Sequence, residues 1–145
     1  MLTRLLGSDV TRMWPLIDRA IETSLDREVL AHSTTKERIL RKILEGRIVC
    51  WLAQYDGEVS GIMMTSILED DIIACRSLLI FLLSSLGKKA KAADFVDGME
   101  KLMAYAQSIN CRRFVFYTKN PKMLKLLKYL SPGISTDYTM AVIDL

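Results

Sequence analysis

The segment DIIACRSLLIFLLSSLGKKAKAADFVDGMEKLMAYAQSINC, residues 71–111, decides the fold of this chain. It contains an apolar run at 72–83, a basic connector at 87–91 and a helix-patterned stretch at 94–109. The apolar window 72–86 is too short for a membrane helix and includes Arg76, so we interpret it as a buried strand. An acidic turn at 69–71 precedes this strand.

The residues before this segment predict a strand, two helices and a hairpin. Strand-like residues lie at 2–6, and apolar spacings of three and four predict helices at 10–25 and 35–45. Pro15 requires that the first helix starts late, near Thr11, or kinks. Thr34 and Glu37 have the spacing of a capping box, and Gly46 is suited to end the second helix. Asp56 and Gly57 predict a tight turn between strands at 47–55 and 58–68.

The residues after this segment predict a strand, a helix and a closing strand. The helix at 94–109 has a predicted buried stripe and a left-handed end at Asn110. A strand is expected at 113–118, a helix beginning at Pro121 with Asn120 as its cap, and a final strand at 136–144. The stripe of the helix at 94–109 consists of Phe95, Met99, Leu102, Met103, Ala106 and Ile109. The leucines of the last helix should face the core and its lysines the solvent.

Length and composition favour one α/β (α+β) domain spanning residues 1–145. Half of the 145 residues are hydrophobic and 26% are charged, which is typical of a globular protein. Cys50, Cys75 and Cys111 form no C-x-x-C pair, so we expect free thiols in a reducing compartment. No metal-ligand motif or signal peptide is recognisable, and the chain is expected to be cytoplasmic, without a metal and without a membrane partner.

Positive charge is concentrated in the second half of the chain. Between Leu86 and Leu130 there are ten lysines and arginines against three acids. This distribution predicts an anionic partner such as a nucleotide phosphate, and the alternative is a solvated lysine face. Few aromatic residues are interleaved with these charges, so nucleic-acid binding is disfavoured.

The order of elements resembles that of the GNAT superfamily of acyl-CoA-dependent N-acetyltransferases across the whole chain. WLAQYDGEVSGIMMTSI (51–67) is similar to the family's central hairpin, and GMEKLMAYAQSINCRRFVFYT (98–118) is similar to its third helix and fifth strand. Tyr129, with Gly133 and Ile134, resembles the ending of the fourth helix. The resemblance implies a central mixed, mostly antiparallel sheet flanked by about four helices.

The resemblance also implies acetyl-CoA or another acyl-CoA as the cofactor. In the family, a loop with the pattern Q/R-x-x-G-x-G/A binds the pyrophosphate through backbone N–H groups. Counting back from Cys111 places Lys91 at the basic position and Asp94 and Val96 at the two glycine positions. The alternative role for Asp94 is that of an N-cap. The cofactor-binding residues that the resemblance implies are Leu82, Leu83, Lys88, Lys89, Lys91 and Asn120.

The resemblance suggests two catalytic residues. Tyr129 matches a tyrosine that acts as a general acid toward the leaving thiolate, and His32 is a candidate general base on the acceptor side. Asn120 and Tyr129 are nine residues apart, whereas the family usually has seven. The alternatives are a helix cap for Asn120 and a half-buried packing residue for Tyr129.

Two functions follow from these observations. The first is an N-acyltransferase that transfers an acyl group to an amine, with weak or lost activity because of the altered loop. The second is a non-catalytic structural or assembly protein, because the altered segment is reminiscent of short GNAT-like proteins encoded among bacteriophage morphogenesis genes. The second function implies a virion or assembly partner and a location in the host cytoplasm or the virion. A homo-oligomer is compatible with both functions.

Overall fold

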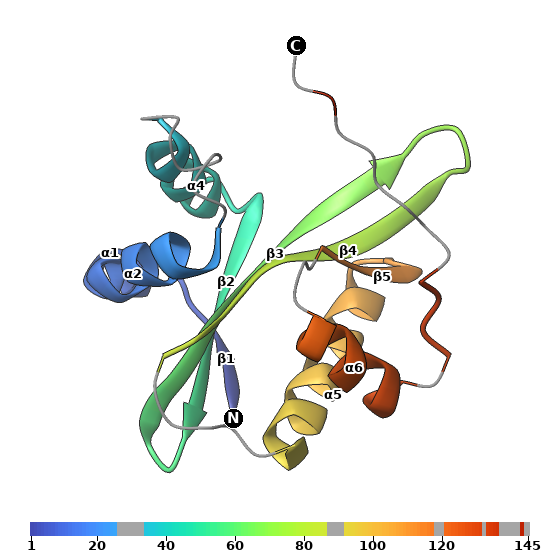
Figure 1. Ribbon diagram of the computed structural model, residues 1–145. Helices are drawn as coiled ribbons and strands as arrows, with labels where there is room; N and C mark the ends of the chain where they lie inside the picture. The colour runs from blue at the N-terminus through green and yellow to red at the C-terminus, as the bar shows by residue number, and fades with distance from the viewer. Residues whose placement is uncertain (26–33, 87–91, 118–120, 132, 137–142, 144–145) are drawn as a thin grey trace.

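The protein is described by a computed structural model that covers residues 1–145 except 26–33, 87–91, 118–120, 132, 137–142 and 144–145. In the described residues one sheet has the strand order β1-β2-β3-β4-β5 (Figure 1). β1 to β4 are antiparallel neighbours and β5 runs parallel to β4, which confirms the mixed, mostly antiparallel sheet. The strands are β1 Leu2–Arg4, β2 Ile48–Tyr55, β3 Glu58–Asp70, β4 Cys75–Ser85 and β5 Arg113–Phe116. The helices are α1 Gly7–Arg12, α2 Trp14–Ser24, α4 Thr35–Leu44, α5 Ala92–Ser108 and α6 Pro121–Leu130.

The helices cover both faces of the sheet, and each face has its own apolar cluster. α1, α2 and α4 pack on one face and α5 on the other (Figure 1). The first cluster includes Val10, Ile17, Ile21, Ile43, Cys50, Ile62, Met64 and Leu82. The second includes Val49, Trp51, Met63, Leu78, Ile80, Leu102, Ala106 and Cys111. Because both faces are covered, β2 and β4 are apolar without a regular alternation.

The hairpin between β2 and β3 is confirmed. Asp56 and Gly57 have φ angles of 50° and 77°, and Tyr55 pairs with Glu58 across the turn. Two successive residues with positive φ are what a two-residue turn of this twist requires. The turn sets the pairing of residues 54–55 with 58–59, and the register then shifts by one residue between Ala53 and Gln54.

The predicted helix at 10–25 is two helices. α1 ends at Arg12 and α2 begins at Trp14, with Met13 between them. Pro15 lies in the first turn of α2, where its missing N–H removes no intrahelical hydrogen bond. The late start near Thr11 is therefore wrong, and in place of the predicted kink the helix is broken just before Pro15.

The second predicted helix is present, but its predicted capping box is wrong. Thr34 precedes α4 with a helical backbone and makes no side-chain cap hydrogen bond, because a capping residue needs an extended backbone to reach the N–H groups. Gly46 has a φ of 74° and follows the helix end, as predicted. Leu44 is exposed rather than part of the inner face, which Ile39 and Ile43 form.

The apolar strand begins later than the sequence predicts. β3 continues to Asp70, and residues 71–74 form the turn, so Ile72 and Ile73 are not strand residues. Asp70 Oδ1 accepts hydrogen bonds from the N–H groups of Ile72 and Ile73, at 3.0 and 3.2 Å, and Ala74 has a φ of 49°. The hydrogen bonds to Asp70, and not the apolar pattern, therefore determine the backbone conformation of this turn.

The helix of the fold-deciding segment begins at Ala92, two residues before the predicted start. Asp94 therefore lies inside the first turn of α5 and is not its N-cap. Met103 is exposed, contrary to prediction, whereas Leu102 and Ala106 are buried. Asn110 has a φ of 59°, which confirms the left-handed end of the helix, and the next residue, Cys111, donates its N–H to Ala106 O at 2.8 Å.

The C-terminal third is described in part. β5 spans Arg113–Phe116, and Pro121 is the first residue of α6, as predicted. Leu127 is buried, and Lys125 and Lys128 are exposed. The predicted cap Asn120 and most of the predicted strand at 136–144 lie outside the described residues; Thr136 and Ile143, which are described, are not in a strand.

Because Cys50 is buried, the free energy of unfolding should change with pH in the alkaline range. Burial raises the pKa of the Cys50 thiol from 9.0 to about 12. Above pH 9 the unfolded chain loses this proton and the native state keeps it, so the free energy of unfolding should fall between pH 9 and about 12. The slope expected from this group is about 1.4 kcal/mol per pH unit. Urea unfolding at several pH values should show a shallower decline for Cys50→Ala than for the wild type, and parallel declines would contradict the prediction.

Candidate functional site

β4 and β5 are paired along only part of β4. The parallel register runs from Ser77 opposite Arg113 to Ile80 opposite Phe116, where β5 ends. β4 continues to Ser85. In the part of the chain that the structure describes, residues 81–85 therefore have no strand on the side where β5 would continue.

A β-bulge lies where the pairing with β5 ends. Ile80 pairs with Thr65 and Leu82 with Met64, so Phe81 is the extra residue. Ile80 belongs to the cluster under α5, whereas Leu82 belongs to the cluster under α1, α2 and α4. The bulge thus changes which face the following side chains occupy and bends β4. Buried Leu82 and partly exposed Leu83 were both predicted cofactor-binding residues and lie directly after this point.

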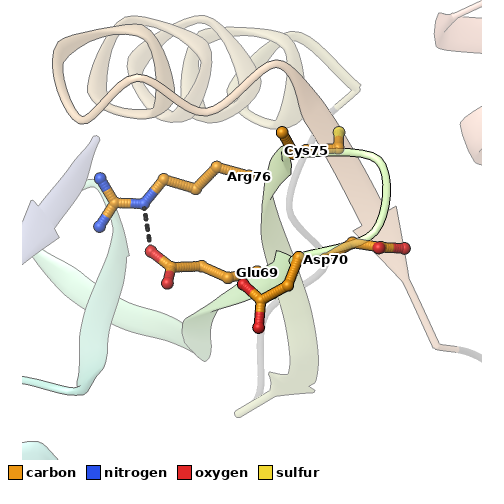
Figure 2. A pocket seen from close by; sticks show the side chains of 6 residues that line it. Glu69, Asp70, Cys75 and Arg76 are labelled. Carbon is orange, nitrogen blue, oxygen red and sulfur yellow. Dashed lines mark ion pairs between the residues drawn. The ribbon is translucent and has the colours of Figure 1, made fainter.

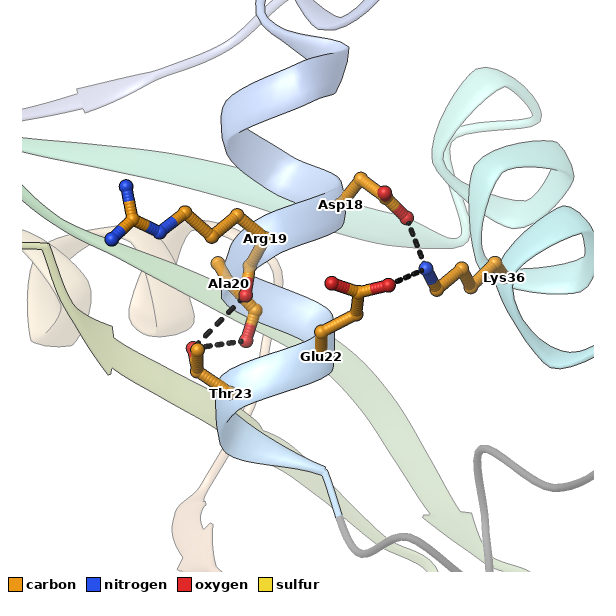
Figure 3. Close-up of polar contacts among 6 residues, drawn as sticks. All are labelled: Asp18, Arg19, Ala20, Glu22, Thr23 and Lys36. Carbon is orange, nitrogen blue, oxygen red and sulfur yellow. Dashed lines mark hydrogen bonds and ion pairs between the residues drawn. The ribbon is translucent and has the colours of Figure 1, made fainter.

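A pair of hydroxyl groups links the end of β4 to the last turn of α2. Thr23 Oγ1 lies 3.2 Å from Ser84 Oγ. It also donates to the backbone oxygens of Arg19 and Ala20 (Figure 3). Since the Thr23 hydroxyl has one hydrogen, Ser84 is the donor in the contact between the two hydroxyls whenever Thr23 donates to its own helix. No local sequence signal indicates this pair, because the two residues are 61 positions apart and neither belongs to a motif.

The end of β4 also packs tightly against β3. Leu86 N–H donates to Ser60 O at 2.9 Å. A Cβ atom on the neighbouring Gly61 would lie 2.7 Å from Ser84 O, closer than real contacts allow. Gly61 is therefore required by the close approach of the two backbones.

α2 and α4 are joined by one lysine on the same side of the sheet. Lys36 Nζ lies 2.7 Å from Asp18 Oδ1 and 2.5 Å from Glu22 Oε1 (Figure 3). Both hydrogen bonds raise the pKa of Lys36, and the one to Asp18 has the larger effect. These contacts fix the relative positions of the two helices that flank residues 26–33.

Most of the predicted site residues lie outside the described part of the chain. These are His32, Lys88, Lys89, Lys91 and Asn120. Tyr129 is described, lies near the end of α6 and is 81% exposed, so it is not the half-buried packing residue of the alternative interpretation. Val96 lies within α5 and is partly exposed.

Two surface hollows lie away from the gap after Ile80. One, of about 190 Å³, is at the β3–β4 turn and is lined by Glu69, Asp70, Asp71, Ala74, Cys75 and Arg76 (Figure 2). Arg76 Nε lies 3.1 Å from Glu69 Oε1 without hydrogen-bond alignment, and Arg76 Nη1 donates to Ile109 O at 2.9 Å. The other, of about 420 Å³, is lined by Thr34, Glu37, Arg38 and Arg41 on α4.

The described residues contain neither a metal-binding cluster nor a membrane-spanning helix. No group of three or more His, Cys, Asp or Glu side chains is arranged to hold a metal ion among them. Within the same residues, no helix has the length and apolar character needed to cross a membrane.

Comparison with known proteins identifies the class of fold. No family model matches the sequence, and no curated protein matches it. A ribosomal-protein-alanine N-acetyltransferase from Brucella melitensis biovar Abortus 2308 superposes with a TM-score of 0.69, at 14% identity, over 100% of this chain and 98% of that chain. A predicted acetyltransferase with acetyl-CoA from Clostridium acetobutylicum gives a TM-score of 0.65, at 12% identity, over 98% and 95%. This chain therefore has an acetyltransferase fold.

A third structure names the family of folds. A GNAT family acetyltransferase from Staphylococcus aureus matches with a TM-score of 0.66, at 11% identity, over 100% of this chain and 98% of that chain. The chain has the GNAT fold, which confirms the fold that the sequence resemblance predicted.

Proposed function

We propose that the protein is an N-acyltransferase that binds acyl-CoA in the gap between β4 and β5. The observation that carries the proposal is the coincidence of the Phe81 bulge with the end of the β4–β5 pairing. A strand edge without a partner presents backbone N–H and C=O groups. The amide-containing arm of coenzyme A can pair with such an edge, so residues 81–85 fit this part of the cofactor.

The remaining roles come from the family resemblance. Lys88, Lys89 and Lys91 would attract the phosphates, and the N-terminal end of the long helix α5 would favour their negative charge. Acyl-CoA would supply the activated thioester. The exposed hydroxyl of Tyr129 would donate its proton to the leaving thiolate, and Asn120 and His32 would serve as polar groups for the cofactor and the acceptor amine.

We also propose that Asp94 weakens cofactor binding. It lies in the first turn of α5, and a carboxylate about 4 Å from a phosphate costs on the order of 4 kcal/mol at an effective dielectric constant near 20. Asp94→Asn removes this charge while keeping the size of the side chain. Coenzyme A should bind to this variant more tightly than to the wild type.

The test is calorimetric titration with CoA and with acetyl-CoA up to about 1 mM, a range that detects even weak binding. Leu83→Trp should weaken binding at least about tenfold, because a large ring there would obstruct the edge of β4. The matched control is Leu68→Trp, since Leu68 is 37% exposed and Leu83 is 38% exposed, but Leu68 lies far along β3. Absence of binding by the wild type, or equal effects of both variants, would refute the proposal.

A second candidate function is a non-catalytic assembly role, including one in a bacteriophage particle. The positions of Asp94 and Val96 inside α5 support it, because neither residue provides the glycine backbone expected for pyrophosphate binding. Recovery of the native protein in a particle, together with absence of CoA binding, would favour this function over acyl transfer. Recovery as a free protein that acylates amines would exclude it.

A further inference from the structure

The β3–β4 hairpin projects beyond the rest of the sheet. The pairing of β2 with β3 ends at Ser66, and that of β5 with β4 begins at Ser77. Residues 67–76, which we call the hairpin tip, therefore form a two-stranded arm that extends past its neighbours (Figure 1). The tip is anchored, since Asp70 holds the turn and Arg76 donates to Ile109 O.

The hairpin tip combines exposed apolar side chains with acidic ones. Ile72 is 95% exposed, and Ile67, Leu68 and Ile73 are exposed as well. Of the three carboxylates beside them, Glu69 is paired with Arg76, whereas Asp70 and Asp71 leave the tip negative. A rigidly held apolar group of this kind is typical of an interaction surface.

A second surface, formed by α4 and the residue before α1, has the complementary character. Leu44 is 56% exposed, and a Cβ atom on Gly7 would lie 4.0 Å from Leu44 Cδ2, so Leu44 lies near Gly7, which follows exposed Leu6. Arg41 and Arg47 flank Leu44 in the sequence and are exposed. Their Nε atoms lie 3.9 and 3.6 Å from the same carboxylate, that of Glu45, so two positive charges share one negative charge. We call Leu6, Arg41, Leu44 and Arg47 the α4 patch.

We propose that the hairpin tip of one copy of this chain docks on the α4 patch of a second copy. Ile72 and Ile73 cover Leu6 and Leu44, and Asp71 lies near the arginines. Two tips would repel each other through their acids, and two patches through their arginines, so only the unlike pair is complementary. A contact between two different surfaces does not close on itself as a dimer, and it extends into rings or chains.

The test is sedimentation velocity on the purified 145-residue chain. At about 0.05 M salt the mass should rise beyond that of a dimer as protein concentration approaches about 1 mM, and it should fall at about 0.5 M salt. Ile72→Asp and Leu44→Asp should each weaken association at least about tenfold. Both side chains are exposed, so the variants should remain folded. The matched control is Ile143→Asp, because Ile143 is 84% exposed and belongs to neither surface.

Mixing the two variants gives the sharpest outcome. Ile72→Asp retains an intact patch and Leu44→Asp retains an intact tip, so an equimolar mixture should form dimers and stop there. A wild-type chain that remains monomeric at every concentration would overturn the proposal. So would association that Ile72→Asp abolishes and Leu44→Asp leaves unchanged, since that pattern means tip-to-tip pairing. Neither outcome depends on acyl-CoA, so this test is independent of the proposed enzymatic function.

Discussion

Deletion of Phe81 should abolish CoA binding while the side chains of β4 keep their present faces. Without this extra residue Leu82 follows Ile80 directly, so the pairs of Ile80 with Thr65 and of Leu82 with Met64 continue as a regular antiparallel ladder. Leu82 then stays in the cluster under α2, and the free energy of unfolding should fall by only about 1–3 kcal/mol, for the loss of the half-buried ring. The strand loses the bend that the bulge produces where the pairing with β5 ends, which is the feature proposed to admit the cofactor. Calorimetric titration with CoA and urea unfolding followed by circular dichroism measure the two effects.

The control for this deletion keeps the bulge and removes only the ring. Phe81 is half-buried, so Phe81→Ala should cost about the same 1–3 kcal/mol and preserve the positions of Leu82 and Ser84. This variant should retain CoA binding, whereas the deletion should abolish it. If the deletion variant bound CoA as tightly as Phe81→Ala, the bulge would not be what opens the gap beside β4.

Gly61→Ala should destabilise the protein by about 1–3 kcal/mol. The added Cβ would lie 2.7 Å from Ser84 O and 3.7 Å from Ser84 C, and these are backbone atoms that move only with the strand. The strand would have to separate from β3 near the bulge, which would also disturb the contact between Ser84 and Thr23. The midpoint of urea unfolding and the melting temperature should both fall.

Gly98→Ala is the matched control for this substitution. Gly98 lies inside α5, and a Cβ atom there would meet nothing within 4 Å. Alanine should therefore stabilise the helix by about 0.5–1 kcal/mol, because it restricts the unfolded chain more than glycine does. Opposite signs for the same substitution at the two glycines are expected. A Gly61→Ala variant as stable as the wild type would show that the β3–β4 contact can relax freely.

The features that the sequence predicted correctly are those determined by local backbone chemistry. Asp56 and Gly57 adopt positive φ angles in any tight hairpin of this kind, and Gly46 and Asn110 are suited to end helices in the same region of φ. Pro121 fits the first turn of α6 because it has no N–H to satisfy. The order of these elements was enough to predict the GNAT fold.

The errors arose where a nearby contact outweighed the pattern. Ile72 reads as a strand residue, but the Asp70 carboxylate binds its N–H and places it in a turn. Thr34 has the spacing of a capping residue, but its backbone is helical. The start of α5 at Ala92 moved Asp94 from the predicted cap into the helix, so the assignment of residues to the pyrophosphate loop rests on the family resemblance alone.

The sequence by itself determined the number and order of most elements, because turns, caps and apolar periodicity act over a few residues. Only the tertiary structure decided the position of the bulge and the extent of the gap beside it. The run LLIFLL at 78–83 is apolar at every position, so it does not indicate where the strand changes faces. Phe81 is the bulge residue because Ile80 and Leu82 pair with the consecutive residues Thr65 and Met64. The gap exists because β5 ends at Phe116. Both facts depend on residues far apart in the chain.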